Sequence, residues 1–176
     1  MAGVPEAEAL AASAVAEDVP AAVAPAAAGD ESMNPKAFIN QLDDAVILKA
    51  IADAEARSSG EIRIYVSRHV AKDVLAEARE AFTRLGMDKT ALRNGVLLYF
   101  VPKSQQFAVI GDEAIHARCG QEFWAGISAT ISERFKAGGF TDGVLTGITT
   151  VGELLAKHFP RSGDDRNELP DRIERD

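Results

Sequence analysis

The chain has 176 residues, which is enough for one domain of ordinary size with additional segments. Its formal net charge is −8, but this excess lies at the two ends, because residues 36–160 contain equal numbers of acidic and basic side chains. A neutral central region offers no basic stripe for phosphate groups, so the sequence argues against nucleic-acid binding. The single cysteine, Cys119, excludes an intrachain disulfide and a metal site made only of cysteines.

The sequence also argues against a membrane-spanning segment, since no apolar run reaches the length of about 18 residues that a bilayer requires. At the N-terminus, Pro5, Glu6 and Glu8 stand where a secretion signal has its basic flank and apolar centre. We therefore predict a cytoplasmic protein. The lone cysteine is compatible with such a reducing compartment.

Composition divides the chain into three parts. Residues 1–33 are rich in Ala and Pro and contain almost no large apolar side chains, which is typical of a disordered acidic tail. Residues 34–160 contain the periodic apolar patterns of a folded domain. Residues 161–176 mix acids with arginines and are predicted to form a charged C-terminal tail.

The folded part begins with a helix, a strand and a second helix. Asn34-Pro35 is a typical helix start, and apolar side chains at helical spacing continue to the stop at residues 58–60. Residues 61–67 alternate polar and apolar side chains, which predicts a half-buried strand near an edge of the sheet. The next helix is expected between a capping Asp73 and Gly86.

Two apolar runs in the middle of the chain predict an antiparallel hairpin. The first, at 96–101, is continuously apolar or aromatic and is expected to be buried on both faces at the centre of the sheet. A polar turn at 102–105 leads into the second run, at 107–110. The strand, helix and strand that begin at residue 61 form a crossover unit, so the first two strands should be parallel.

Two more helices are predicted after the hairpin. One covers residues 121–136 with Trp124 on its inner face, and the other is capped by Thr141 and ends at Pro160. The complete order predicts an α/β fold, namely a three-layer αβα sandwich with a small mixed sheet of three to four strands flanked by helices.

Motif searches exclude several enzyme classes. The sequence has no Gly-rich phosphate loop, no dinucleotide-binding fingerprint and no nucleophile elbow. Cys119 is not followed six residues later by an arginine, because that position is Ala125, so a cysteine-phosphatase loop is absent. His116 with Cys119 would supply half a zinc site, although such a pair is more often ordinary loop chemistry.

The predicted topology gathers oxygen-bearing side chains at one edge of the sheet, where the first two strands start and the third ends. They are Glu61, Asp88, Asn94, Asp112 and Glu113. Carboxylate and amide oxygens are the ligands that hard cations such as Ca²⁺ and Mg²⁺ prefer. The alternative, which the sequence alone favours, is that the Asn and Asp residues here are turn residues that bind their own backbone.

Six segments follow one another in a characteristic order: Ser59–Ile62, Arg93–Tyr99, Gly111–Asp112, Phe135–Gly143, Phe159–Pro160 and Asn167–Pro170. This ordered set resembles the TPM domain family, which is named for thylakoid lumen phosphatase, a photosystem-repair factor and a worm receptor modulator. The resemblance extends over about residues 36–173, and its ending looks like that of a compact bacterial branch.

This resemblance implies an αβα sandwich, a divalent cation bound at strand-end loops and, in some members, weak acid phosphatase activity. Many members are extracytoplasmic and anchored to membranes, and this sequence departs from them because it shows neither a signal nor an anchor. It also departs after the third strand, where the family's more usual Gly-x-Gly is Gly111-Asp112-Glu113.

Three hypotheses for the function follow. The first is a domain that binds Ca²⁺ or Mg²⁺ and acts through an unknown protein partner. The second is a metal-assisted acid phosphatase of phosphomonoesters, in which Asp112 acts as the general base. The third is a scaffold whose acidic ends mediate weak association without any cation.

Overall fold

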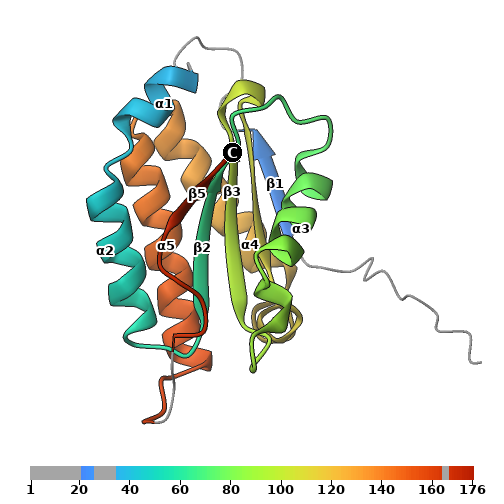
Figure 1. Ribbon diagram of the computed structural model, residues 1–176, viewed down its shortest axis with the longest axis vertical. Helices are drawn as coiled ribbons and strands as arrows, with labels where there is room; N and C mark the ends of the chain where they lie inside the picture. The colour runs from blue at the N-terminus through green and yellow to red at the C-terminus, as the bar shows by residue number, and fades with distance from the viewer. Residues whose placement is uncertain (1–20, 26–34, 164–166) are drawn as a thin grey trace, which may run out of the picture.

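The computed structural model describes residues 21–25, 35–163 and 167–176, which form a three-layer sandwich with one mixed sheet in the middle (Figure 1). The strand order is β1-β4-β3-β2-β5. The strands are β1 (Ala21–Pro25), β2 (Glu61–Val66), β3 (Gly95–Val101), β4 (Gln106–Gly111) and β5 (Ile173–Arg175). The predicted α/β class and sandwich architecture are confirmed.

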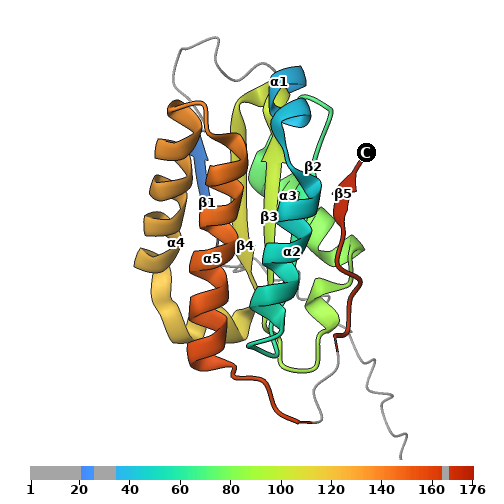
Figure 2. The ribbon, with the colours of Figure 1, turned by 90° about the vertical axis from the view of Figure 1, so that its left-hand side faces the viewer.

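Helices cover both faces of the sheet. Figure 2 shows the side formed by α1 (Pro35–Gln41), α2 (Asp44–Glu55), α4 (Glu113–Lys136) and α5 (Phe140–His158), with α4, α5 and α2 side by side. The opposite face is covered by α3 (Val74–Arg84), which is followed by the short 3₁₀ helix η1 (Met87–Lys89). A second 3₁₀ helix, η2 (Pro102–Ser104), turns the chain between β3 and β4.

Strand β3 lies at the centre of the sheet and is buried along its whole length, as its continuous apolar sequence predicts. Its side chains alternate between two cores because successive residues of a strand point to opposite faces. Leu98 and Phe100 belong to the larger core under α2, α4 and α5, while Leu97 and Tyr99 belong to the smaller core under α3.

Strand β2 pairs in parallel with β3, as predicted, but it is buried rather than half-buried. The prediction of an exposed face was based on the alternation of polar and apolar residues in this strand. In the folded protein, Glu61 and Arg63 are buried together as an ion pair, and β5 covers the outer edge of the strand. Alternation of polar and apolar residues therefore does not indicate exposure when the polar residues neutralise each other.

Both outer strands come from segments that composition assigns to the tails. β1 pairs antiparallel with β4, and β5 pairs parallel with β2. Strand pairing uses backbone N–H and C=O groups, so an Ala-rich or a charged segment can join a sheet without large apolar side chains. The remaining residues of the predicted N-terminal tail, 1–20 and 26–33, lie outside the described residues, as do residues 164–166.

The predicted first helix is divided in two, and a helical segment before residue 121 was not predicted. The first helix is interrupted at Asp43, whose side chain accepts a hydrogen bond from the backbone N–H of Val46 and so caps α2. Helix α4 begins at Glu113, and a kink at Gly120, with φ of 68°, separates this additional segment from the predicted helix at 121–136. An Asp cap and a left-handed glycine explain both differences, because each allows the chain to change direction locally.

The predicted cap of the last helix is also wrong, because Gly139 rather than Thr141 occupies the N-cap position of α5. The Thr141 hydroxyl instead donates to the backbone carbonyl of Gln41 at 2.7 Å, and it accepts from the N–H of Asp43 at 3.2 Å. These contacts tie the start of α5 to the junction between α1 and α2.

The close contact between β4 and α4 predicts a strong effect of a single methyl group. A Cβ atom on Gly111 would lie 2.1 Å from the Trp124 ring, whereas a Cβ atom on Gly126 would meet nothing within 4 Å. We expect Gly111→Ala to lower the free energy of unfolding by about 2 kcal/mol through overpacking. Gly126→Ala, the matched control in the same helix layer, should raise it by up to about 1 kcal/mol.

Urea denaturation of both variants would measure these differences. A Gly111→Ala protein as stable as the wild type would show that Trp124 can move away, and would contradict the tight packing of α4 on the end of β4.

Candidate functional site

Backbone pairing brings three chain segments to one end of the sheet, at the bottom of Figure 1. Gly95 is the register partner of Glu61 in β2, and its carbonyl accepts a hydrogen bond from the N–H of Asp112 at 2.9 Å. We call this end, where β2 and β3 start and β4 finishes, the strand-start edge. The predicted meeting of the three segments is therefore confirmed.

Three of the five side chains predicted for a cation site share one property. Each has a buried oxygen that accepts no hydrogen bond from any residue in the described part of the chain. We call these atoms the open oxygens: Oδ1 of Asp88, Oδ1 of Asn94 and Oδ2 of Asp112. A buried acceptor without a partner costs free energy, so each of these oxygens is a candidate acceptor for a water molecule or ligand for an ion.

Asp112 has two functions at the strand-start edge. Its Oδ1 caps helix α4 by accepting from the N–H of Glu113 at 2.7 Å. The same oxygen accepts from Arg93 Nε at 3.2 Å and forms an ion pair with Arg93 Nη2 at 2.9 Å. The residue is only 3% exposed. The interpretation of Asp112 as a turn residue that binds its own backbone is thus correct for Oδ1, while Oδ2 is an open oxygen.

Arg93 connects Asp112 to the loop that contains Asp88. Its Nη1 donates to the backbone carbonyl of Asp88 at 2.7 Å, on the opposite side of the guanidinium group from the Asp112 contacts. The next residue, Asn94, is completely buried, and its Nδ2 donates to the hydroxyl of Ser59 at 3.3 Å. Arg93 and Asn94 therefore connect the loop before β3 to Asp112 and to Ser59.

The other two predicted ligands provide no open oxygen. Glu61 uses one carboxylate oxygen to accept from the N–H of Glu168 at 2.7 Å and the other to accept from Arg63 at 3.3 Å. Glu113 lies in the exposed first turn of α4. Among the residues that the structure describes, no group of three or more His, Cys, Asp and Glu side chains is close enough to hold a metal ion.

A buried charge cluster next to Glu61 was not predicted. Arg63 lies 3.4 Å from a carboxylate oxygen of Glu55 and 3.3 Å from one of Glu61. Burial raises the pKa of Glu55 to about 8. The hydrogen bond from the N–H of Ile62 lowers the pKa in part, and smaller upward contributions come from Glu61 and Asp171. The raised pKa favours the protonated form of Glu55 at neutral pH, in which Arg63 has a single carboxylate, Glu61, to neutralise.

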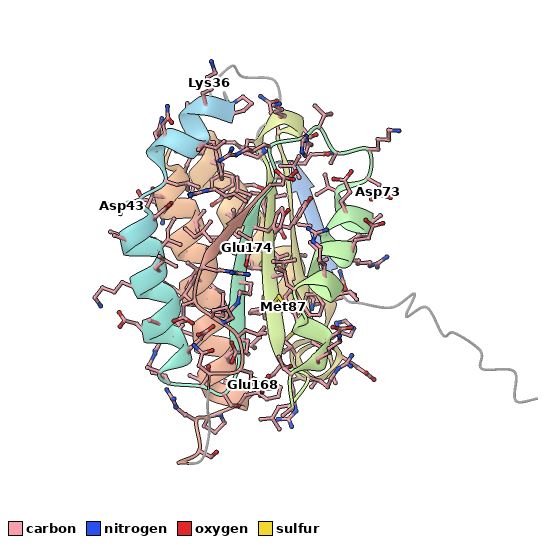
Figure 3. The ribbon with its side chains drawn as sticks, in the orientation of Figure 1. Lys36, Asp43, Asp73, Met87, Glu168 and Glu174 are labelled. Atoms are coloured by element: carbon pink, nitrogen blue, oxygen red, sulfur yellow. The ribbon has the colours of Figure 1, made fainter. Side chains whose placement is uncertain are left out.

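The C-terminal segment covers this cluster. Asn167 donates to a carboxylate oxygen of Glu55 at 3.3 Å, and the backbone N–H of Glu168 donates to Glu61. The carboxylate of Glu168 (Figure 3) accepts from the N–H of Ala91, in the loop that leads to the open oxygens. A cavity of about 240 Å³ remains between this segment and the end of α2. The only sequence signal for these contacts was the Asn167–Pro170 motif.

Comparison with known proteins identifies the family. The family model of the TPM domain matches residues 33–154, which is most of the chain. The chain belongs to the TPM domain family. Its fold is similar to that of the BA42 protein from the psychrophilic bacterium Bizionia argentinensis, solved by NMR, with a TM-score of 0.71. The two sequences are 38% identical, and the similarity covers 76% of this chain and 92% of BA42. A search of curated proteins found no match.

The structure of this TPM domain also bears on two further predictions, which concern a membrane-spanning segment and a zinc site. None of its described helices is both long and apolar enough to cross a bilayer; the compartment itself remains a prediction. The minor possibility of a zinc site gains no support, because His116 Nδ1 accepts from the Trp124 indole at 3.3 Å. Burial also raises the pKa of the Cys119 thiol, which disfavours the thiolate that zinc requires.

The raised pKa of Glu55 predicts how the stability of the TPM domain depends on pH. The folded state holds this proton up to about pH 8, whereas the unfolded state releases it near pH 4.5. The stabilising contribution is therefore complete below about pH 4.5 and is lost progressively as the pH rises toward 8. Glu55→Gln, which mimics the protonated form, should flatten this decline.

Urea denaturation at several values between about pH 5 and about pH 8 would test this expectation. Glu153→Gln, at an exposed carboxylate of α5, is the matched control and should keep the wild-type slope. If Glu55→Gln also kept that slope, Glu55 would be ionised in the folded protein and the charge balance described above would be wrong.

Proposed function

We propose that this TPM domain binds a divalent cation, Ca²⁺ or Mg²⁺, at the strand-start edge and acts through a protein partner. The ligands would be Asp88, Asn94 and Asp112. The observation that supports this proposal is the set of three open oxygens, all of which belong to residues predicted from the sequence as cation ligands. Glu61 is left out because both of its oxygens accept hydrogen bonds, and Glu113 remains an exposed neighbour.

The chemistry of these residues fits a hard cation. Two carboxylates and one amide supply only oxygen ligands, which Ca²⁺ and Mg²⁺ prefer over nitrogen or sulfur. The Asp112 carboxylate is held through its other oxygen by the N–H of Glu113, so its open oxygen is already oriented. Waters and backbone carbonyls would complete the coordination, as is usual for both ions.

A protein partner is preferred to catalysis as the primary role because no sequence motif places a nucleophile or a histidine general base at this edge. A cation held by a rigid edge can order the adjacent loop and so shape a surface for another protein.

Titration with CaCl₂ and MgCl₂, followed by amide NMR, tests the proposal. We expect the amides around Asp88, Asn94 and Asp112 to shift together and to report one dissociation constant. Asp112→Asn should weaken binding by about tenfold or more, since it removes a charged ligand. Because Asn caps helices as well as Asp does, this variant should keep α4 intact.

Glu113→Gln is the matched control, since it removes one negative charge from the adjacent, exposed position. It should bind the cation nearly as well as the wild type because an exposed charge is screened by solvent. Scattered weak shifts without saturation would contradict a cation site, and equal weakening by both variants would contradict the assignment of Asp112 as a ligand.

A metal-assisted acid phosphatase is the second candidate. The observation that favours it is Arg93, whose side chain is half exposed beside Asp112 and can present its guanidinium group to a phosphate. A bound divalent cation would supply the charge that polarises a phosphoryl oxygen. In this candidate, Arg93 orients the phosphate and Asp112 accepts the proton of the attacking water.

Hydrolysis of an aryl phosphate such as p-nitrophenyl phosphate would measure this activity in the presence of Ca²⁺ or Mg²⁺. Asp112→Asn should reduce the rate by about a hundredfold or more if Asp112 is the general base. Unchanged hydrolysis in Asp112→Asn, or a rate no higher than that of buffer in the wild type, would exclude this role.

A further inference from the structure

Arg93 places a positive charge directly beside the proposed cation ligands, which a cation site does not require. Its guanidinium group makes two hydrogen bonds at the strand-start edge, from Nε to Oδ1 of Asp112 and from Nη1 to the backbone carbonyl of Asp88, and its Nη2 forms an ion pair with the same Oδ1. It is thus itself a cation placed between two residues that carry open oxygens. The acid that it neutralises is buried, whereas half of the arginine side chain is exposed.

The backbone also holds Arg93 in an unusual conformation. Its φ angle is 52°, in the left-handed region that favours glycine or asparagine. Its N–H donates to the carbonyl of Thr90 at 3.2 Å, and its carbonyl accepts from the N–H of Ala114 at 3.3 Å. An arginine at a position suited to smaller residues indicates that its side chain, rather than its backbone preference, has a role here.

We propose that the Arg93 guanidinium is the resident counter-ion of the cation site, and that a divalent cation binds by displacing it from Asp112. This inference rests on the proposed cation-binding function and specifies how that site is regulated. In the cation-free protein Arg93 neutralises the buried Asp112. When a cation approaches the open oxygens, repulsion between the two positive charges moves the half-exposed arginine into solvent.

This arrangement makes the site selective for divalent ions. A monovalent ion such as Na⁺ would replace one positive charge with another and lose the directional hydrogen bonds of the guanidinium group. A divalent ion brings an additional charge that compensates for those lost hydrogen bonds. Removing the arginine should therefore tighten the binding of divalent ions and also weaken the discrimination against monovalent ions.

Calorimetric titration of the full chain with CaCl₂ tests the inference in three proteins. Arg93→Gln should bind Ca²⁺ about tenfold more tightly than the wild type, because the competing charged hydrogen bonds are gone. Added NaCl should compete more strongly in this variant. Lys89→Gln removes the same charge from an exposed position of the same loop and should change the affinity by no more than about twofold.

A spectroscopic signal of Arg93 itself provides a second measurement. In the cation-free wild type the Nε–Hε group, which donates to Asp112, should give a slowly exchanging NMR signal. At saturating Ca²⁺ this signal should broaden or disappear through exchange with water. If Arg93→Gln fails to fold, Arg93→Lys keeps the charge without the forked donors and should bind Ca²⁺ with intermediate affinity.

The possible outcomes separate the inference from the function on which it rests. If neither the wild type nor Arg93→Gln binds Ca²⁺, Mg²⁺ or Mn²⁺, the proposed cation site is wrong, and the inference falls with it. If the wild type binds but Arg93→Gln binds equally or more weakly, the site stands and the counter-ion role is overturned. An Nε–Hε signal that persists at saturation would also overturn displacement.

Discussion

The double pairing of β3 is the constraint on which the rest of the site depends. Because β3 is parallel to β2 and antiparallel to β4, Glu61, Asn94 and Asp112 must meet at one edge. A slip of either pairing by one residue would turn the side chains of that strand to the opposite face. The Trp124 ring lies so close to Gly111 at the end of β4 that only glycine fits there, so a slipped β4 would bring a side chain against the ring.

The strand-start edge concentrates acids, and two arginines neutralise them in different ways. Arg63 is buried between Glu55 and Glu61, and a proton on Glu55 completes the balance. Arg93 is half exposed, so it can leave Asp112 at little cost in buried surface. Burial thus distinguishes the arginine enclosed in the fold from the one that we propose to exchange with a cation. Glu168 links the two clusters by binding both Glu61 and the loop of Ala91.

The strand-start edge could be predicted from the sequence because it depends only on strand order and direction, and the apolar runs define these. Whether each oxygen has a hydrogen-bond partner could not be predicted, because the partners of Glu61 lie on β2 and on the distant C-terminal segment. Glu55 at a helix end is indistinguishable from a solvated residue until its tertiary partners are known. Strands β1 and β5 were missed because they join through the backbone, which leaves no pattern in the side chains.

The central claim is that the open oxygens bind a divalent cation, and an anomalous diffraction measurement tests it most directly. A crystal of the full chain soaked in MnCl₂ should show a strong anomalous difference peak in contact with Asp88, Asn94 and Asp112, because Mn²⁺ accepts the same oxygen ligands as Mg²⁺ and Ca²⁺. A peak only at exposed carboxylates elsewhere, or no peak while the three oxygens bind ordered water, would contradict the account.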